Sequence, residues 1–235
     1  MILYALRVLV VKMDNALIIF IKYPEPGKVK TRLAKAVGNE RACAIYKSIA
    51  EDVIKNVSLK NPRTYDAYTF FTPQDKENEI KDWLMPVRNN DQAFDTRYIP
   101  QEGDTLGERM SHAFQQLFQD KSYKRCIIIG TDCPEINVTL IENAFETLQG
   151  KDIVLGPCRD GGYYLLGMSR LSPIRFEREF VLDLFVDIDW STDRVFDQTT
   201  AKVRKNNLSY SILKTLADVD TPEDLYRYRY ALDIP

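Results

Sequence analysis

The feature that most constrains the fold is a continuous apolar run at residues 126–129, which stops at a Gly-Thr-Asp turn closed by Pro134. Four apolar residues without polar alternation are typical of a central parallel strand that is covered on both faces. Open α/β sheets bind their ligands just past the carboxyl ends of such strands. Asp132 is therefore a candidate metal or phosphate-site residue, although its carboxylate is equally suited to cap a helix that begins near Val138.

A second run of this kind, at residues 16–21, predicts another central strand. The loop that follows, residues 22–33, holds two prolines and a glycine, which restrict the backbone. Arginine binds phosphate through a bidentate fork and lysine through a point charge. We favour a clamp for a di- or triphosphate over a solvated basic loop, because high charge density coincides with a strand end. The loop's cations are Lys22, Lys28, Lys30 and Arg32.

The rest of the chain alternates between helical and strand patterns. Apolar residues recur at helical spacing over residues 39–59, and an aromatic, β-branched run at 64–71 predicts a strand. The alternation predicts a single-domain, Rossmann-like α/β fold over residues 14–235, with a mostly parallel sheet flanked by helices. We expect residues 1–13 to be an N-terminal extension or an alternative start.

Charge and composition exclude several classes of protein. With 32 Lys and Arg against 34 Asp and Glu, the net charge of -2 gives no global field for nucleic acid or an anionic membrane surface. The apolar start of the chain is too short to span a bilayer and lacks the features of a signal peptide. The four cysteines lack zinc-site spacing, and one histidine excludes multi-His metal centres. We therefore expect a soluble, cytoplasmic protein with reduced cysteines.

Two turns carry further polar residues. The Asp-Gly-Gly sequence at residues 160–162 would let a backbone approach a ligand closely. Taken alone it better fits a tight hairpin turn in which Asp160 bonds its own backbone. Glu102 and Asp104 crowd a second turn, and no structural role explains them.

Helix caps account for several other polar residues. A Ser, Thr or Asn before an apolar-periodic segment is a typical N-cap, and Glu three residues later completes a capping box. The predicted caps are Thr105 with Glu108, Ser191 or Thr192 for a helix through Lys205, and Thr221 before Pro222 for the terminal helix.

Four separated motifs are informative in their order and spacing: PEPGKVKTRL at residues 24–33, GERM at 107–110, GTDCP at 130–134 and DGGYYLLG at 160–167. Together they resemble a family of bacterial glycosyltransferase A-like proteins. That family is related to phospholactate guanylyltransferase and includes members assigned to arsenosugar biosynthesis. Two supporting matches are WST at 190–192 and DVDTPEDL at 218–225. The resemblance covers about residues 14–230.

The resemblance implies a metal site. Asp132 is similar to the metal-binding Asp of a D-x-D element, but Cys133 and Pro134 stand where a second acid is expected. Asp160 is the implied second ligand or, alternatively, the catalytic base that activates an acceptor hydroxyl. Mg²⁺ or Mn²⁺ suits carboxylates together with substrate phosphates.

The resemblance also implies a reaction: transfer of a glycosyl group from a nucleotide-diphospho sugar to a small-molecule acceptor. The single glycine of the first loop favours this donor over a nucleoside triphosphate. Guanylyltransferase-like nucleotidyl transfer with release of pyrophosphate, and a catalytically degenerate nucleotide-binding module, remain as alternatives. The implied phosphate-binding residues are Lys28, Lys30, Thr31 and Arg32, and the weaker candidates for acceptor or sugar contacts are Glu102, Asp104, Gly161, Gly162 and Asp189.

Overall fold

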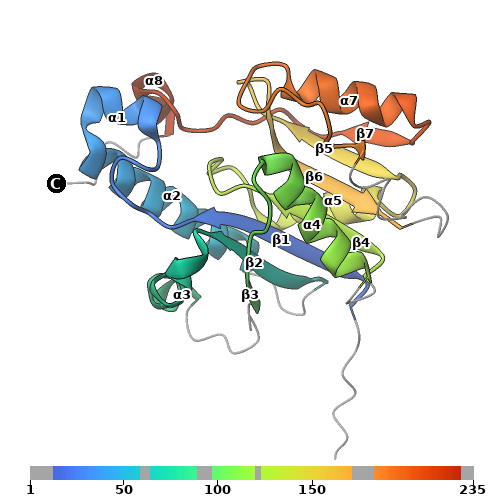
Figure 1. Cartoon of the computed structure of the whole chain (residues 1–235), viewed down its shortest axis with the longest axis horizontal. Coiled ribbons are helices and arrows are strands. Elements are labelled where there is room, and N and C mark those ends of the chain that lie inside the picture. The colour runs from blue at the N-terminus through green and yellow to red at the C-terminus, as the bar shows by residue number, and fades with distance from the viewer. Residues whose placement is uncertain (1–12, 59–63, 89–96, 120–122, 171–182, 229–235) are drawn as a thin grey trace, which may run out of the picture.

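A seven-stranded sheet runs through the centre of the computed structural model, which describes residues 13–58, 64–88, 97–119, 123–170 and 183–228 (Figure 1). The strand order is β3-β2-β1-β4-β6-β5-β7. The two apolar runs that dominate the sequence, in β1 and β4, are hydrogen-bonded neighbours. The strands are β1 (Asn15–Lys22), β2 (Asp66–Thr72), β3 (Arg97–Pro100), β4 (Arg125–Ile129), β5 (Ile153–Pro157), β6 (Tyr163–Ser169) and β7 (Tyr210–Ile212).

Among the described strands, the pairings are parallel except those of β6, which runs antiparallel to both β4 and β5. β5 and β6 are joined by the short turn at residues 158–162. The predicted mostly parallel α/β sheet is therefore confirmed. Because β6 reverses direction, the 158–162 turn lies on the side of the sheet where the carboxyl ends of β1 and β4 lie.

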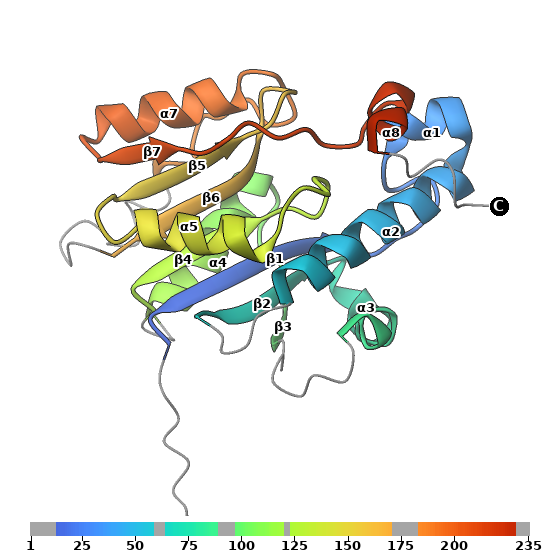
Figure 2. The ribbon, with the colours of Figure 1, turned by 180° about the vertical axis from the view of Figure 1, so that it is seen from behind.

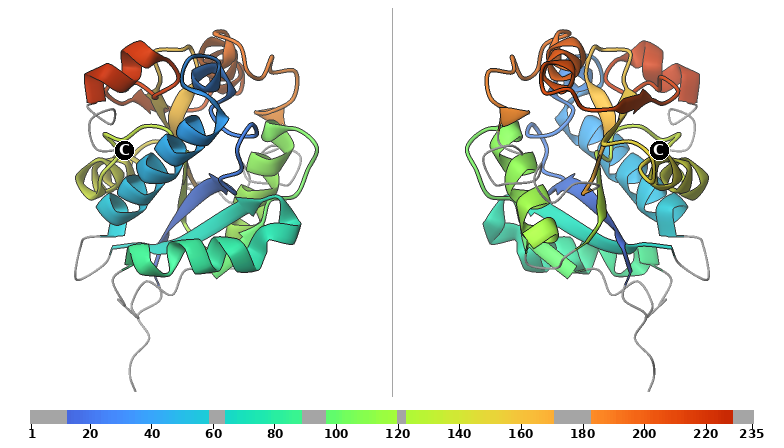
Figure 3. Two further views of the ribbon diagram at one scale, coloured as in Figure 1. Left: turned by 90° about the vertical axis from the view of Figure 1, so that its left-hand side faces the viewer. Right: turned by 90° about the vertical axis from the view of Figure 1, so that its right-hand side faces the viewer.

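Helices cover both faces of the sheet. α4 lies on one face, and α2 and α5 lie on the other (Figures 1 and 2). Figure 3 shows the sheet edge-on between these layers. α1 and α8 contact each other beyond the carboxyl end of β1. The helices are α1 (Thr31–Val37), α2 (Asn39–Ser58), α3 (Glu77–Leu84), α4 (Leu106–Gln119), α5 (Val138–Thr147), α7 (Val195–Lys205) and α8 (Pro222–Tyr228), with 3-10 turns η1 (Gln74–Lys76) and η2 (Pro86–Arg88).

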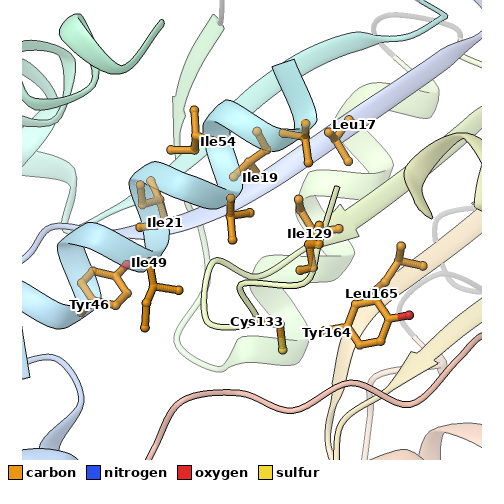
Figure 4. Close-up of a cluster of buried hydrophobic side chains, with 14 of the residues drawn as sticks. Leu17, Ile19, Ile21, Tyr46, Ile49, Ile54, Ile129, Cys133, Tyr164 and Leu165 are labelled. Atoms are coloured by element: carbon orange, nitrogen blue, oxygen red, sulfur yellow. The ribbon is translucent and has the colours of Figure 1, made fainter. Parts of the chain in front are cut away.

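The core has two parts, one on each face of the sheet. In β1, Leu17 and Ile19 pack under α2 and α5 (Figure 4), whereas Ala16 and Ile18 pack under α4. All four are fully buried. Since both faces are covered, an unbroken apolar run fits this strand better than an alternating one.

The N-terminus of α5 decides one alternative that the sequence left open for Asp132. The Asn137 side chain accepts a hydrogen bond from the Leu140 backbone N–H at 3.1 Å and caps the helix. Asp132 lies five residues earlier, in the turn after β4. The interpretation of Asp132 as a helix cap is therefore wrong.

Other predicted helix ends vary in accuracy. The capping box of Thr105 with Glu108 and the N-cap at Thr221 are confirmed, because the Glu108 N–H donates to Thr105 Oγ1 and the Asp224 N–H to Thr221 Oγ1, both at 3.2 Å. α7 ends at Lys205 as predicted, but neither Ser191 nor Thr192 is its N-cap. The helix begins later because Thr192 Oγ1 instead donates to the Asp189 carbonyl in the preceding turn, at 2.7 Å. The basic loop is also shorter than predicted, since α1 begins at Thr31.

The first dozen residues of the predicted N-terminal extension lie outside the described part of the chain. Where the structure describes helices, none combines the length and the apolar character that a membrane crossing needs.

Candidate functional site

A cavity of about 930 Å³ opens at the carboxyl ends of β1 and β4. The basic loop and the start of α1, residues 28–32, line it together with the turns at 130–132 and 160–162 and the segment 218–220. Its volume is in the range of small-molecule sites. The site therefore lies where open α/β sheets bind ligands.

Lys30 is nearly enclosed at this site, with 4% of its side chain exposed. Its ammonium lies 2.6 Å from Asp132 Oδ1 and 2.9 Å from Asp220 Oδ1. A left-handed backbone (φ 46°) turns the chain at Lys30 from the loop into α1. Burial disfavours the charged form, but the two carboxylates outweigh it and raise the pKa of Lys30 above its ordinary value. Lys30 is therefore a permanent cation between two acids.

Tyr46 anchors the loop that carries Lys30. The Tyr46 hydroxyl donates to the Lys22 carbonyl and accepts from the Lys22 N–H, both at 3.0 Å. Lys22 Nζ donates to the Lys28 carbonyl at 2.8 Å. With its backbone tied in this way, the loop leaves the side chains of Lys28 and Arg32 about two-thirds exposed at the cavity.

Asp218 and Asp160, which both line the cavity, form an acidic cluster with Cys158. One ligand atom from each of the three lies within 4.8 Å of the others. Burial, followed by the negative charges of Asp160 and Asp220, raises the pKa of Asp218 to about 7. Asp218 is thus partly protonated near neutral pH, and a cation bound there would displace its proton.

The segment that contains Asp218 is fixed by backbone hydrogen bonds to the neighbouring turns. The Leu216 N–H donates to the Pro157 carbonyl at 3.0 Å, and the Val219 N–H donates to the Asp132 carbonyl at 3.3 Å. Val219 is fully buried. Asp218 and Asp220, on either side of it, both line the cavity.

The Asp-Gly-Gly turn has the predicted local structure: Asp160 Oδ1 accepts from the Gly162 N–H at 2.9 Å. Gly161 has φ +88°, and a Cβ there would lie 2.1 Å from the Asp193 carbonyl oxygen. This glycine therefore serves a close approach of two backbones. The turn also brings Asp160 and Gly162 to the cavity.

One wall of the cavity is apolar. It includes Leu106 and Met110 of α4, Tyr163 of β6 and Trp190. A Cβ on Gly107 would lie 2.8 Å from the Trp190 ring, so the glycine lets this ring pack against α4. A lining that combines apolar and charged residues suits a ligand with both kinds of surface.

The structure brings most of the predicted site residues together. Lys28, Lys30, Thr31, Arg32, Asp132, Asp160 and Gly162 all line the cavity. Within the described residues, four weaker candidates are not part of its lining: Glu102, Asp104, Gly161 and Asp189. Asp189 instead pairs with Arg194 at 3.0 Å.

Sequence reasoning missed Asp218 and Asp220. The N-cap Thr221 gives their segment a structural role, which the structure confirms, and no other role was predicted for it. The overlooked signal is the spacing: two acids flank one apolar residue, so both side chains point away from the core when that residue is buried.

The donor set fits a hard divalent cation. Carboxylate oxygens are preferred by Mg²⁺ and Mn²⁺. Lys30 compensates Asp132 and Asp220, whereas in the described part of the chain no Lys or Arg forms an ion pair with Asp160 or Asp218. Burial is the main cause of the raised pKa of Asp218, and the negative charges of Asp160 and Asp220 add to it. Asp160 and Asp218 are therefore the best placed residues to hold a cation.

Comparison with known proteins places the chain in a family. A family described as uncharacterized proteins conserved in bacteria, DUF2064, matches residues 57–192, which is more than half of the chain. The chain belongs to this family. A solved structure from Desulfovibrio desulfuricans G20, described as a "putative nucleotide-diphospho-sugar transferase", is 33% identical with a TM-score of 0.78. The match covers 94% of this chain and 90% of that one.

Two further proteins extend the comparison. 2-Phospho-L-lactate guanylyltransferase from Methanocaldococcus jannaschii is 26% identical over 203 residues, which are 84% of this chain and 75% of that protein. 4-Diphosphocytidyl-2C-methyl-D-erythritol synthase from Anaerococcus prevotii DSM 20548 shares the fold, with a TM-score of 0.57, 13% identity and coverage of 95% and 100%. The resemblance to guanylyltransferases and nucleotide-diphospho-sugar transferases is confirmed, and the relatives' names identify an enzyme of the transferase class.

Proposed function

We propose that this family member is a metal-dependent transferase that moves a glycosyl group from a nucleotide-diphospho sugar to a small-molecule acceptor. The observation that carries the proposal is that exposed cations and a carboxylate cluster line the same cavity. A diphosphate between them would meet positive charge from the protein and from a cation held by the carboxylates.

The basic side binds the diphosphate. Arg32 offers a planar fork and Lys28 a point charge, and the exposure of both lets them reach a ligand. Thr31 adds a hydroxyl at the start of α1. Lys30 holds Asp132 and Asp220 in place. Its ammonium could exchange one of these carboxylates for a substrate phosphate.

Asp160 and Asp218 hold the cation, Mg²⁺ or Mn²⁺. Asp132 stays a predicted metal ligand. It would become available to the cation when the Lys30 ammonium pairs with a substrate phosphate instead. A divalent cation held by these residues would supply positive charge to the departing nucleoside diphosphate. Alternatively, Asp160 is not a metal ligand but the base that accepts the acceptor's hydroxyl proton, since its turn lines the cavity beside the apolar wall.

The acceptor lies against the apolar wall. Trp190 and Tyr163 present ring surfaces that suit the apolar faces of a sugar or a similar small molecule. The wall adjoins the Asp160 turn, so an acceptor there would sit next to the proposed base.

A panel of nucleotide-diphospho sugars tests the proposal. The expected result is release of a nucleoside diphosphate that requires Mn²⁺ or Mg²⁺ and is lost in Asp218→Asn. Lys151→Ala, an exposed change outside the cavity, is the matched control. Binding of nucleotide sugars without turnover across many acceptors would instead indicate the catalytically degenerate module.

Guanylyltransferase-like nucleotidyl transfer is the second candidate, and the 26% identical guanylyltransferase from Methanocaldococcus jannaschii favours it. In that reaction a phosphorylated acceptor attacks a nucleoside triphosphate and pyrophosphate leaves. The loop argues against a triphosphate, because the Lys28 N–H is already bonded to the Glu25 carbonyl at 3.0 Å. Pyrophosphate release from a nucleoside triphosphate, without turnover of nucleotide sugars, would decide for this candidate.

A further inference from the structure

Cys133 and Cys158 form a close pair of thiols beside the acidic cluster. Their sulfur atoms lie 3.6 Å apart, and both thiols are free. Cys133 follows β4 and is 2% exposed, next to Tyr164 at the edge of the core (Figure 4). Cys158 follows β5 and is half-buried. The pair therefore joins the two turns that carry Asp132 and Asp160.

The separation of the two sulfurs matches a metal site. A disulfide requires about 2.05 Å between them. Two thiolates that bind one tetrahedral Zn²⁺ at about 2.3 Å each lie about 3.8 Å apart. The observed 3.6 Å is close to the second value. The side chains are thus already spaced for one thiophilic cation.

Two carboxylates lie beside Cys158, one sulfur of the pair. Cys158 Sγ and one carboxylate oxygen each of Asp160 and Asp218 lie within 4.8 Å of one another. Thiolates select zinc-like cations, whereas Mg²⁺ and Mn²⁺ require oxygen ligands. We infer that Cys133, Cys158, Asp160 and Asp218 form a binding site for a thiophilic divalent cation such as Zn²⁺. Two Zn–S bonds form as two S–H bonds break, and both protons pass to solvent.

Zinc in this site would regulate the enzyme. Because Asp160 and Asp218 are shared, Zn²⁺ and the hard catalytic cation exclude each other, and this step rests on the proposed function. Zn²⁺ is therefore an inhibitor that competes with Mn²⁺.

Cobalt spectroscopy tests the site without any need for turnover. The reduced, metal-free full chain is titrated with Co²⁺, and the thiolate-to-cobalt charge-transfer band is recorded before and after addition of Zn²⁺. Cys158→Ser removes one sulfur at a half-buried position. Cys43→Ser, which changes a buried thiol of α2, is the matched control. Thermal melting of each variant checks the fold.

The expected result is a thiolate band in the wild type and in Cys43→Ser, its loss in Cys158→Ser, and its displacement by Zn²⁺. The Zn²⁺ affinity of Cys158→Ser should be roughly 100-fold lower than that of the wild type, because one of the bonds that supply the binding energy of the site is lost. An equally strong band in Cys158→Ser overturns the inference. The absence of a thiolate band in the wild type also overturns the inference. This holds whether or not peroxide treatment produces a Cys133–Cys158 disulfide. A thiolate band in a protein that turns over no nucleotide substrate would uphold the site and remove only the proposed function.

Discussion

The ammonium of Lys30 lies 2.6 Å from a carboxylate oxygen of Asp132, although the two residues belong to loops a hundred positions apart in the chain. The same ammonium reaches Asp220 near the C-terminus at 2.9 Å. One buried cation thus joins the loop after β1, the turn after β4 and the segment before α8. Because these three segments build the cavity, its shape depends on this contact.

Replacing Lys30 with methionine should destabilise the protein. The change keeps most of the side-chain volume but leaves Asp132 and Asp220 without their partner. Breaking a fully buried pair costs about 3–5 kcal/mol. Asp132 is half exposed, so the expected loss here is about 2–3 kcal/mol in the free energy of unfolding by urea.

Lys28→Met is the matched control, because Lys28 lies in the same loop with 65% of its side chain exposed. It should change stability by less than about 0.5 kcal/mol. Equal effects of the two substitutions would show that the buried ion pair does not hold the site together.

Asp218 should make the metal-free protein less stable as pH rises from about 4 to 7. Its folded-state pKa of about 7 lies above its ordinary value. In that window the unfolded chain has already released the proton that the folded chain retains. The unfolded state then binds fewer protons, so stability falls with increasing pH. Urea unfolding with a chelator present, across this range, measures the slope.

Asp218→Asn should flatten that slope, since the amide does not titrate. Asp197→Asn, a change on the first turn of α7, should leave it intact. If Asp218→Asn retained the pH dependence of stability, that dependence would arise from another titrating group.

The sheet and the place of the candidate cavity could be predicted from the sequence, because the two apolar runs favour central strands and ligands bind at the ends of such strands. The basic loop could also be predicted, from the high density of positive charge in the sequence. In each case the signal lies within a dozen residues. The partner of each side chain was not visible, because Lys30 and Asp220 meet only after the whole chain has folded.

The missing second acid after Asp132 illustrates the same limit. Local spacing shows Cys133 and Pro134 at the positions that follow. The fold supplies acids from elsewhere, by pairing Leu216 with Cys158 and so drawing Asp218 beside Asp160. Sequence distance carries no information about that contact.

Gly161→Ala should destabilise the fold and disturb the site. The new Cβ would lie 2.1 Å from the Asp193 carbonyl oxygen, and the left-handed φ of +88° adds strain. We expect a loss of about 2–4 kcal/mol in the free energy of unfolding. Gly150→Ala is the control, since a Cβ there meets no atom within 4 Å. Similar stability of both variants would mean that the turn relaxes freely.

Arg32→Ala should weaken nucleotide binding without weakening the fold. Arg32 is 64% exposed, lines the cavity and lies 3.8 Å from Asp220, so its stabilising contribution is small. A charge-assisted hydrogen bond to phosphate is worth about 1.5–3 kcal/mol, which predicts a Kd for a nucleoside diphosphate raised roughly 10-fold to 100-fold. Lys35→Ala removes a cation from the same helix, at a position outside the cavity lining, and should change the Kd little. Calorimetric titration compares the variants. If they bind alike, net charge alone attracts the nucleotide, and the basic loop is not a phosphate clamp.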